Sequence, residues 1–291
     1  MTSPAPSVAP SVALVTGTSS GMGLHAAVEL ARRGLTVVAT MRDLGRADRL
    51  RTTAAEAGVE LDVRALDVTD HEAARLCVAE VLADHGRINV LVNNAGRGAV
   101  GTAEQLSMDE IRAQLEVNYL GPVALTKLVL PAMRAAGSGR VVTVTSVGGA
   151  VGQPFADAYC GAKFAVEGFM QSLSSVAMAH GVTVSVIEPA AVASDFVANV
   201  ARPVDDAASE TADDPYAAQL DAYLARSAGA FAAAQSAHDA GVAIADAATS
   251  QDERFRWQTS EGATAFVGLS LADHDGSRVL VATRPWTQTP D

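Results

Sequence analysis

The chain begins with a short apolar strand, a glycine-rich turn and a helix, and this order then repeats. Residues 12–16 (V-A-L-V-T) run into G-T-S-S-G-M-G, after which Leu24, Val28 and Leu30 place apolar side chains at helical spacing. Strands that alternate with helices about a dozen residues long form right-handed βαβ crossovers. The sequence therefore predicts the α/β class, with a doubly wound parallel sheet covered by helices on both faces. Its first half is expected to hold further strands over 36–40, 61–66 and 88–92 and helices over 44–57 and 70–85.

The second half continues this pattern up to about residue 190. The expected elements are a helical stretch over 106–136 that is broken near Gly121 and Pro122, a helix over 157–180, and strands over 140–146 and 182–188.

The segment from about 190 to 235 lacks this periodicity, because alanine and aspartate dominate and large apolar residues are sparse. We interpret it as a partly helical insertion that forms a lid over a site. Candidate strands over 254–259 and 278–282 return the chain to the core. The chain is thus expected to hold a flexible leader (1–10) and one domain (11–291).

Composition excludes several classes of function. Hydrophobic residues make up 49% of the 291 residues and charged residues 19%, which is enough apolar material for a large core. The net charge of −12 would repel both nucleic acid and an anionic membrane surface, so neither is an expected partner. Two cysteines, and no apolar run long enough to span a membrane, favour a cytoplasmic protein. The six histidines show no metal-ligand spacing, so no metal site is expected.

The glycine turn after the first strand is suited to binding a phosphate. Gly17, Gly21 and Gly23 let the backbone approach a pyrophosphate, and the following helix supplies unpaired N–H groups. The intervening Ser19, Ser20 and Met22 would line the same turn. A tight turn without a ligand is the alternative.

The residue type at the end of the second strand distinguishes two nicotinamide cofactors. An acid there would accept the ribose hydroxyls of NAD(H), whereas Arg42 offers a guanidinium to the 2′-phosphate of NADP(H). Arg42 therefore favours NADP(H) over NAD(H). Asp43, which follows directly, could instead hold a ribose, and Arg42 could simply be solvated.

A tyrosine and a lysine are spaced for acid–base chemistry. Lys163, one of only two lysines, follows Tyr159 by four residues, so one helix would place both side chains on one face. A neighbouring ammonium is expected to lower the pKa of the tyrosine toward the working range. Ser146 lies near the carboxyl end of an expected strand, where parallel sheets place their sites. The alternative is a half-buried tyrosine beside a solvated lysine.

These motifs together resemble the classical short-chain dehydrogenase/reductase family, whose fold is of the Rossmann type. The residues that carry the resemblance are the T-G-x-x-x-G-x-G turn, N-N-A-G at 93–96, and the set Asn118, Ser146, Tyr159 and Lys163. The longer match S-V-G-G-A-V-G-Q-P-F-A-D-A-Y-C-G-A-K-F-A-V-E-G, with A-T-M-R-D and E-R-F-R-W-Q-T-S, looks like the NADP(H)-preferring branch that holds 17β-hydroxysteroid dehydrogenase type 1 and related retinol dehydrogenases.

The resemblance implies an NADP(H)-dependent oxidoreductase that transfers a hydride to or from a hydrophobic alcohol or ketone, with carbonyl reduction favoured. Tyr159 would be the acid or base, Ser146 would hold the carbonyl, and Lys163 would also bind the nicotinamide ribose. Asn118 would organise a water that relays protons to the lysine. Assembly as a homodimer or homotetramer is also implied.

Further cofactor and substrate residues follow from the same resemblance. Ser20 would join Arg42 at the 2′-phosphate, and Asp67 would contact the adenine, although a helix N-cap is an equal alternative for Asp67. The remaining expected cofactor residues are Val68, Asn94, Ala95, Gly96, Pro189, Val192 and Ser194, and the remaining expected substrate residues are Gln153, Phe155 and Phe196.

The loop after the sixth strand departs from the family pattern P-G-x-V-x-T, because it reads P-A-A-V-A-S. If the family glycine needs a positive φ, Ala190 must follow another path at some cost. Lid residues such as Tyr216, Tyr223 and Phe231 could cover an apolar substrate or simply pack the helix.

Two rival functions use the same fold. A catalytically silent NADP(H)-binding redox sensor would tend to lose the tyrosine or the lysine, and this chain keeps both. A sugar-nucleotide epimerase or dehydratase typically carries T-G-x-x-G-x-x-G, which differs from the glycine spacing here.

Overall fold

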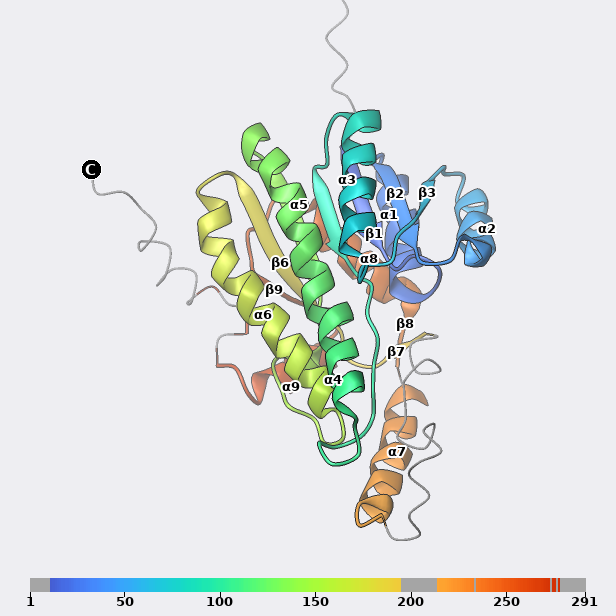
Figure 1. The fold of residues 1–291 in the computed structure, drawn as a ribbon, viewed down its shortest axis with the longest axis vertical. Helices are drawn as coiled ribbons and strands as arrows, with labels where there is room; N and C mark the ends of the chain where they lie inside the picture. The colour runs from blue at the N-terminus through green and yellow to red at the C-terminus, as the bar shows by residue number, and fades with distance from the viewer. Residues whose placement is uncertain (1–10, 195–213, 233, 273, 276, 278–291) are drawn as a thin grey trace, which may run out of the picture.

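A seven-stranded parallel sheet forms the centre of the molecule (Figure 1). The computed structural model describes residues 11–194, 214–232, 234–272, 274–275 and 277. The strand order is β3-β2-β1-β4-β5-β6-β9, so the direction of winding reverses between β1 and β4. The strands are β1 (Val12–Thr16), β2 (Thr36–Met41), β3 (Asp62–Ala65), β4 (Val90–Asn93), β5 (Gly139–Val144), β6 (Val182–Glu188) and β9 (Arg256–Gln258).

Helices cover both faces of this sheet, as predicted. One face packs against α3 (His71–His85), α5 (Gly121–Ala136) and α6 (Asp157–Met178), with Leu125 and Met170 fully buried there. The other face packs against α1 (Gly21–Arg32), α2 (Asp48–Glu56) and α8 (Ala237–Thr249). These two apolar layers are the hydrophobic core of a single domain of the Rossmann type.

The long helical stretch is divided by a π-helical segment. Helix α4 (Met108–Leu115) passes into η2 (Glu116–Leu120) and then into α5, so the break lies directly before Gly121. Gly121 packs there against Val68, because a Cβ on Gly121 would lie 3.0 Å from the Val68 side chain.

Several expected boundaries were wrong. The predicted helix over 44–57 is two pieces, the 3₁₀ turn η1 (Leu44–Arg46) and α2. The predicted strand over 140–146 ends at Val144, since Ser146 already caps the 3₁₀ turn η3 (Val147–Gly149). Helix α8 was not predicted, because its alanine-rich sequence has no clear stripe of large apolar residues. It packs closely against α1 through small residues such as Gly241.

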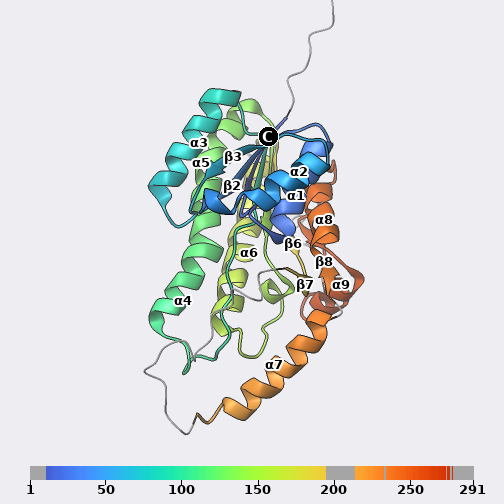
Figure 2. The same ribbon diagram turned by 90° about the vertical axis from the view of Figure 1, so that its right-hand side faces the viewer.

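In its described residues, 190–194, 214–232 and 234–235, the expected lid forms two short strands and a helix. They are β7 (Val192–Ala193), the helix α7 (Ala217–Ala232) and β8 (Gln235–Ser236), which pairs with β7. Helix α7 projects beyond the sheet at the end where the β-strands finish (Figures 1 and 2). The chain continues through α8 and β9 to the short helix α9 (Glu261–Gly268). The leader 1–10, the candidate strand 278–282 and Phe196 lie outside the described residues.

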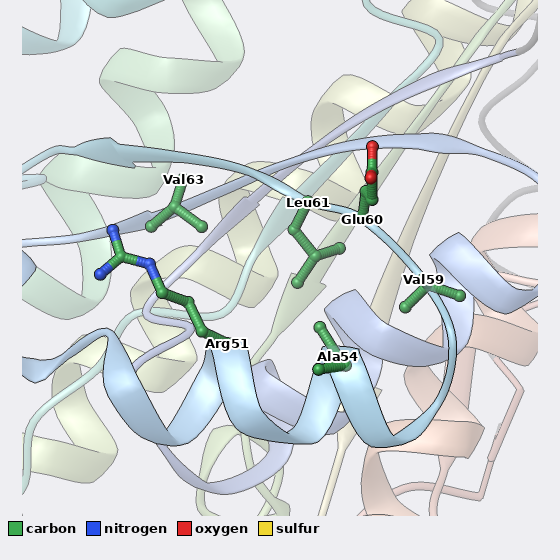
Figure 3. A pocket seen from close by; sticks show the side chains of 7 residues that line it. Arg51, Ala54, Val59, Glu60, Leu61 and Val63 are labelled. Carbon is green, nitrogen blue, oxygen red and sulfur yellow. The ribbon is translucent and has the colours of Figure 1, made fainter.

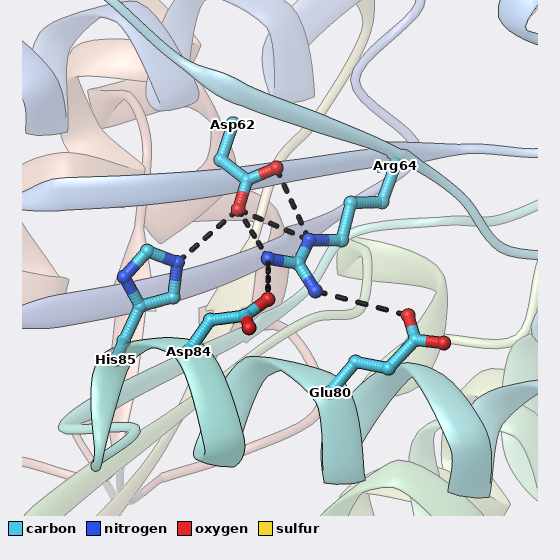
Figure 4. A network of polar contacts seen from close by, with 5 residues as sticks. All are labelled: Asp62, Arg64, Glu80, Asp84 and His85. Carbon is cyan, nitrogen blue, oxygen red and sulfur yellow. Dashed lines mark hydrogen bonds and ion pairs between the residues drawn. The ribbon is translucent and has the colours of Figure 1, made fainter.

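Edge strand β3 is tied to α3 by a network of ion pairs (Figure 4). The Arg64 guanidinium contacts Asp62 at 2.5 Å, Asp84 at 2.8 Å and Glu80 at 3.8 Å, and His85 lies 3.1 Å from Asp62. Partial burial raises the pKa of Asp62, but the hydrogen bonds and positive charges of Arg64 and His85 outweigh this effect, so the pKa is lowered overall.

Candidate functional site

The glycine turn lies between β1 and α1, at the point where the sheet changes its winding direction. Gly17 and Gly21 have φ values of 70° and 62°, which favour glycine. A Cβ on Gly17 would lie 2.8 Å from the Ala95 backbone, and a Cβ on Gly23 would lie 2.5 Å from the Gly17 carbonyl oxygen. The turn therefore sits tightly against the segment after β4.

Asn94 fastens this turn to the sheet. Its Nδ2 donates to the carbonyl oxygens of Thr16 (2.8 Å) and Gly17 (3.0 Å). The Thr16 hydroxyl in turn accepts from the backbone N–H groups of Asn94 and Ala95, each at 3.0 Å. The side chain of Asn94 thus fixes the backbone of the glycine turn itself.

The first turn of α1 keeps donors that no side chain of the helix caps. Ser20 is the N-cap residue, with extended backbone, yet its hydroxyl makes no capping hydrogen bond. The N-terminal N–H groups of a twelve-residue helix, with a half-buried serine beside them, form a natural anion site. Ser194, from the segment after β6, approaches Gly21 so that a Cβ there would lie 3.2 Å from the Ser194 Cβ.

Charged residues follow directly after β2 and soon after β3, and they differ in exposure and in hydrogen-bond partners. Arg42 is exposed, and no described residue forms an ion pair with it, whereas Asp43 accepts from the backbone N–H of Gly45 at 2.8 Å. The Asp67 carboxylate accepts from the N–H and the hydroxyl of Thr69, at 2.9 and 2.8 Å. The N-cap alternative for Asp67 is wrong, because Asp70 caps α3 through the N–H of Ala73. The side chain of Val68 is buried in the core.

Tyr159, Lys163 and Ser146 come together at the carboxyl end of β5. Tyr159 and Ser146 are joined by a side-chain hydrogen bond, and the Ser146 hydroxyl accepts from the N–H of Gly148 at 2.9 Å. Lys163 Nζ donates to the carbonyl of Val144 at 3.0 Å and lies 5.8 Å from the centre of the Tyr159 ring. Helix α6 places the two side chains on one face, as predicted.

The protonation of this pair differs from the expectation. Burial raises the pKa of Tyr159 to about 12, although the bond to Ser146 opposes it, and burial lowers the pKa of Lys163 to about 8. The predicted lowering of the tyrosine pKa was therefore wrong. The cost of removing a phenolate from water outweighs the hydrogen bond from Ser146, and Cys160 and Tyr223 raise the pKa of Tyr159 further.

Asn118 is buried in the π-helical segment and faces the loop after β4. Its Nδ2 donates to the carbonyl of Arg97 (2.9 Å) and to Gln114 Oε1 (3.0 Å), and its Oδ1 accepts from the N–H of Arg97 (3.3 Å). A Cβ on Gly96 would lie 3.1 Å from Asn118 Oδ1 and 3.7 Å from Lys163 Nζ. Gly96 thus leaves an open approach between the asparagine and the lysine.

Two of the expected substrate residues, Gln153 and Phe155, lie in the loop between η3 and α6. Phe155 has a φ of 55°, which is unusual for a non-glycine residue, and its ring lies 5.6 Å from the ring of Tyr223 on α7. Gln153 Nε2 would lie 2.9 Å from a Cβ on Gly148, so it contacts the turn that follows Ser146. Helix α7 therefore meets the loop that precedes α6 at Phe155.

The loop after β6 follows an ordinary path despite Ala190. Phe155 is the one non-glycine residue with positive φ in the described part of the chain, so Ala190 carries no such strain. The carbonyl of Pro189 accepts from the N–H of Val147 at 3.0 Å, and Val192 is buried in the strand pair β7–β8.

Sequence reasoning missed a buried polar cluster beneath this site. Glu167, Glu188 and Arg256 are each less than a tenth exposed, and Thr145 joins them through Glu167. The signal was present in the spacing, because Glu167 follows Lys163 by four residues. Its partner Arg256 is 89 residues away, however, which no local pattern reveals.

A separate depression of about 390 Å³ lies between α2 and β3 (Figure 3), and none of Ser146, Tyr159 and Lys163 lines it. Its walls are mostly aliphatic, from Ala54, Val59, Leu61 and Val63, with Arg51 at one side. Among the described residues, no group of three or more histidine, cysteine or acidic side chains could hold a metal ion. No helix in the described part of the chain is long and apolar enough to cross a membrane.

The fold and this arrangement of residues belong to a known family. The family model for short chain dehydrogenases matches residues 11–205, and the chain is a member of that family of oxidoreductases. It is 37% identical to retinol dehydrogenase 8 of Bos taurus over 275 residues, which cover 92% of this chain and 88% of the relative. It is 36% identical to human 17-beta-hydroxysteroid dehydrogenase type 1 over 283 residues, which cover 94% and 85%. The resemblance to this branch is therefore confirmed.

Solved structures give the same result. A short-chain dehydrogenase from Streptomyces avermitilis is 30% identical, with a TM-score of 0.78 and coverage of 96% of this chain and 97% of the other. A metagenomic short-chain oxidoreductase in complex with NADP is 34% identical, with a TM-score of 0.60 and coverage of 62% and 84%. A short chain dehydrogenase/reductase from Burkholderia phymatum in complex with NAD shares the fold, with a TM-score of 0.77, 24% identity and coverage of 97% and 98%.

Proposed function

We propose that this protein is an NADP(H)-dependent reductase of hydrophobic ketones that runs in reverse on the corresponding secondary alcohols. The observation that carries the proposal is the Ser146–Tyr159 hydrogen bond beside the buried Lys163 and Asn118, at the carboxyl end of the sheet. A bound nicotinamide cofactor would supply or accept the hydride. The chain's own residues would hold the reacting oxygen and move its proton.

The proton would come from Tyr159. Because its pKa is raised to about 12, Tyr159 carries its proton at neutral pH in the ligand-free protein. It can then donate this proton to a carbonyl oxygen that the Ser146 hydroxyl also holds. Lys163 and Asn118 face each other across Gly96, which supports a water-linked path by which the proton on Tyr159 is replaced. In the oxidation of an alcohol the same residues would act in reverse, with Tyr159 accepting the proton.

The cofactor would lie across the reversal between β1 and β4. The Ser20 end of α1, with its uncapped N–H groups, fits a pyrophosphate, and Gly17 and Gly21 allow its close approach. Arg42 is exposed and without an ion-pair partner among the described residues, which supports a role toward the 2′-phosphate of NADP(H). Asp43 is engaged in capping η1, so it is a weaker candidate for a ribose contact. Pro189, Val192 and Ser194 would border the nicotinamide.

The substrate would be apolar and would lie under α7. Tyr216, Leu220, Tyr223, Leu224 and Phe231 are half-buried, whereas Ala218, Gln219 and Ala222 of the same helix are exposed. This spacing gives α7 one apolar face, and Tyr223 on that face reaches Phe155. The retinol and hydroxysteroid dehydrogenases among the relatives carry apolar substrates in their names, which supports the same class of ligand here.

The experiment is NADPH oxidation at 340 nm against a panel of steroid, retinoid and aryl ketones. We expect turnover by the wild type, little or none by Tyr159→Phe, and normal turnover by Tyr119→Phe, whose ring packs edge-on against Phe169 away from Ser146. Tight NADPH binding with no turnover across the panel would instead favour a redox sensor. Equal turnover by Tyr159→Phe would contradict the assignment of the acid.

A further inference from the structure

Four charged side chains are buried together under the catalytic turn, and the proposed reaction uses only one of them. The Arg256 guanidinium, from β9, contacts the carboxylates of both Glu167 and Glu188, the latter at 2.7 Å. Glu188 also accepts from the amide of Gln258. Two carboxylates then face one guanidinium, and the fourth charge of the group is the ammonium of Lys163.

Glu167 is the member of this cluster that reaches the catalytic residues. It lies one helical turn beyond Lys163 on α6. Burial and the neighbouring Glu188 raise the pKa of Glu167 to about 7, although Arg256 and the Thr145 hydrogen bond oppose this. The ionised carboxylate raises the pKa of Lys163 against the effect of burial. Its Oε1 accepts from the hydroxyl of Thr145 at 2.7 Å, and Thr145 directly precedes Ser146. Glu188, by contrast, is bonded to Arg256 and Gln258 of β9 and not to Thr145 or Lys163.

The same carboxylate also supports the turn that positions Ser146. A Cβ on Gly149 would lie 2.8 Å from the Glu167 Cδ, so the carboxylate occupies the space that a side chain at 149 would need. Gly149 ends η3, whose Gly148 N–H donates to the Ser146 hydroxyl. The backbone N–H of Thr145 donates to the carbonyl of Ile187 at 2.8 Å, which joins this turn to β6. Glu167 therefore contacts the Thr145 side chain before Ser146 and the Gly149 backbone after it.

We propose that Glu167 is a positioning residue for the catalytic group: it fixes Thr145 and the 147–149 turn beneath Ser146, and its carboxylate, when ionised, is the buried negative charge one helical turn from the Lys163 ammonium. The proposal rests on the catalytic roles proposed above. The groups that face Glu167 are Lys163 on α6, Thr145 after β5, Glu188 on β6 and Arg256 on β9. Arg256 connects the positioning to the last strand of the sheet.

The charge effect can be measured without turnover, because Lys163 is one of only two lysines. In a Lys127→Arg background, protein labelled with ¹³C at lysine Cε gives one signal, whose shift against pH reports the pKa of Lys163. We expect Glu167→Gln to lower this pKa by about one unit, since a neighbouring negative charge is lost. Glu188→Gln removes a carboxylate from the same cluster and should leave the Lys163 titration within about 0.3 units of its original position. An unchanged titration in Glu167→Gln, or an equal shift in Glu188→Gln, would overturn the charge role.

The positioning effect is tested with Thr145→Val, which keeps the shape and the charges but removes the hydroxyl. We expect kcat to fall about tenfold or more, with the NADPH dissociation constant and the Lys163 titration unchanged. Glu167→Asp, which keeps the charge and withdraws the carboxylate, should show the same loss without the pKa shift. Unchanged kcat in both variants would overturn the positioning role. If the wild type reduces no ketone, the proposed function fails, while the Lys163 titration still decides the charge role.

Discussion

The Asn94 amide packs directly against the Gly23 backbone and occupies the space that a side chain at position 23 would need, so only a glycine fits there. Asn94 Nδ2 donates to Thr16 and Gly17, and a Cβ on Gly23 would lie 2.5 Å from the Gly17 carbonyl oxygen. The phosphate turn, β1 and the segment after β4 are therefore fixed by one side chain. This contact makes a direct prediction about cofactor binding.

Gly23→Ala should weaken NADPH binding by about tenfold or more, because the methyl group must displace the Asn94 amide from a close-packed turn. The dissociation constant is measured by NADPH fluorescence titration. Gly168→Ala is the matched control, since it is also a helical glycine but would meet nothing within 4 Å. Equal affinities of the two variants would show that the Asn94 contact is not needed for binding.

Arg42→Ala should reduce kcat/KM with NADPH by about 10- to 100-fold and leave kcat/KM with NADH nearly unchanged. A charge-assisted bond to a 2′-phosphate contributes roughly 1.5–3 kcal/mol, and NADH has no such group. Arg46→Ala removes a second exposed arginine from the same region and serves as the control. A parallel loss with both cofactors would remove Arg42 from the 2′-phosphate site.

Tyr223→Ala should raise KM for a bulky apolar ketone by about 3- to 10-fold and change kcat little, because it removes the ring that meets Phe155 over the proposed pocket. Gln219→Ala alters an exposed residue of the same helix and should change neither constant. Steady-state kinetics with small and bulky ketones check the difference. Identical KM values across the variants would place the substrate elsewhere.

Asp62→Asn should lower the free energy of unfolding at pH 7, because it removes the ion pairs of Asp62 with Arg64 and His85 (Figure 4). The loss should be about 1 kcal/mol or less, since these pairs are partly exposed. The pKa of Asp62 is lowered from 3.8 in the folded protein, so its contribution is present above that pH and is lost as the pH falls below it. The difference between variant and wild type should therefore vanish in acid.

Thermal unfolding between pH 7 and pH 3 measures this effect. Asp109→Asn removes a carboxylate that is 91% exposed and should leave stability unchanged. A difference between Asp62→Asn and the wild type that grows on acidification would contradict the assignment.

Phe164→Glu should convert a homo-oligomer into a monomer, because Phe164 and Val176 are large apolar side chains exposed on α6, at 45% and 48%. Light scattering after size-exclusion chromatography gives the mass of the particle. Leu76→Glu changes an equally exposed side chain on α3, at 47%, and should leave the assembly intact. A wild-type monomer, or loss of assembly in both variants, would contradict an interface at α6.

The local sequence was sufficient for the elements that carry the chemistry. A strand followed by a glycine turn and a helix predicted β1 and α1, and the four-residue spacing of Tyr159 and Lys163 placed both on one face of α6. The break near Gly121 was also visible in the sequence, although its form as a π segment that carries Asn118 was not. These features follow from periodicity and backbone preference, which act over a few residues.

Alanine-rich segments were less predictable. Helix α8 packs against α1 through Gly241, where a Cβ would lie 2.6 Å from that of His25, and such close contacts between small residues leave no strong apolar stripe in the sequence. Asp67 and Asp70 are both acids before the same helix, and only the backbone geometry shows that Asp70 is the cap.

The sequence by itself determined the α/β architecture, the phosphate turn and the set Asn118, Ser146, Tyr159 and Lys163. Only the tertiary structure decided how these residues are protonated and what lies beneath them. Burial raises the pKa of Tyr159 and lowers that of Lys163. The fold also brings Glu167 into contact with Arg256, which lies 89 residues away in the sequence. Desolvation and contacts between distant segments exist only once the chain has folded, so no local pattern can encode them.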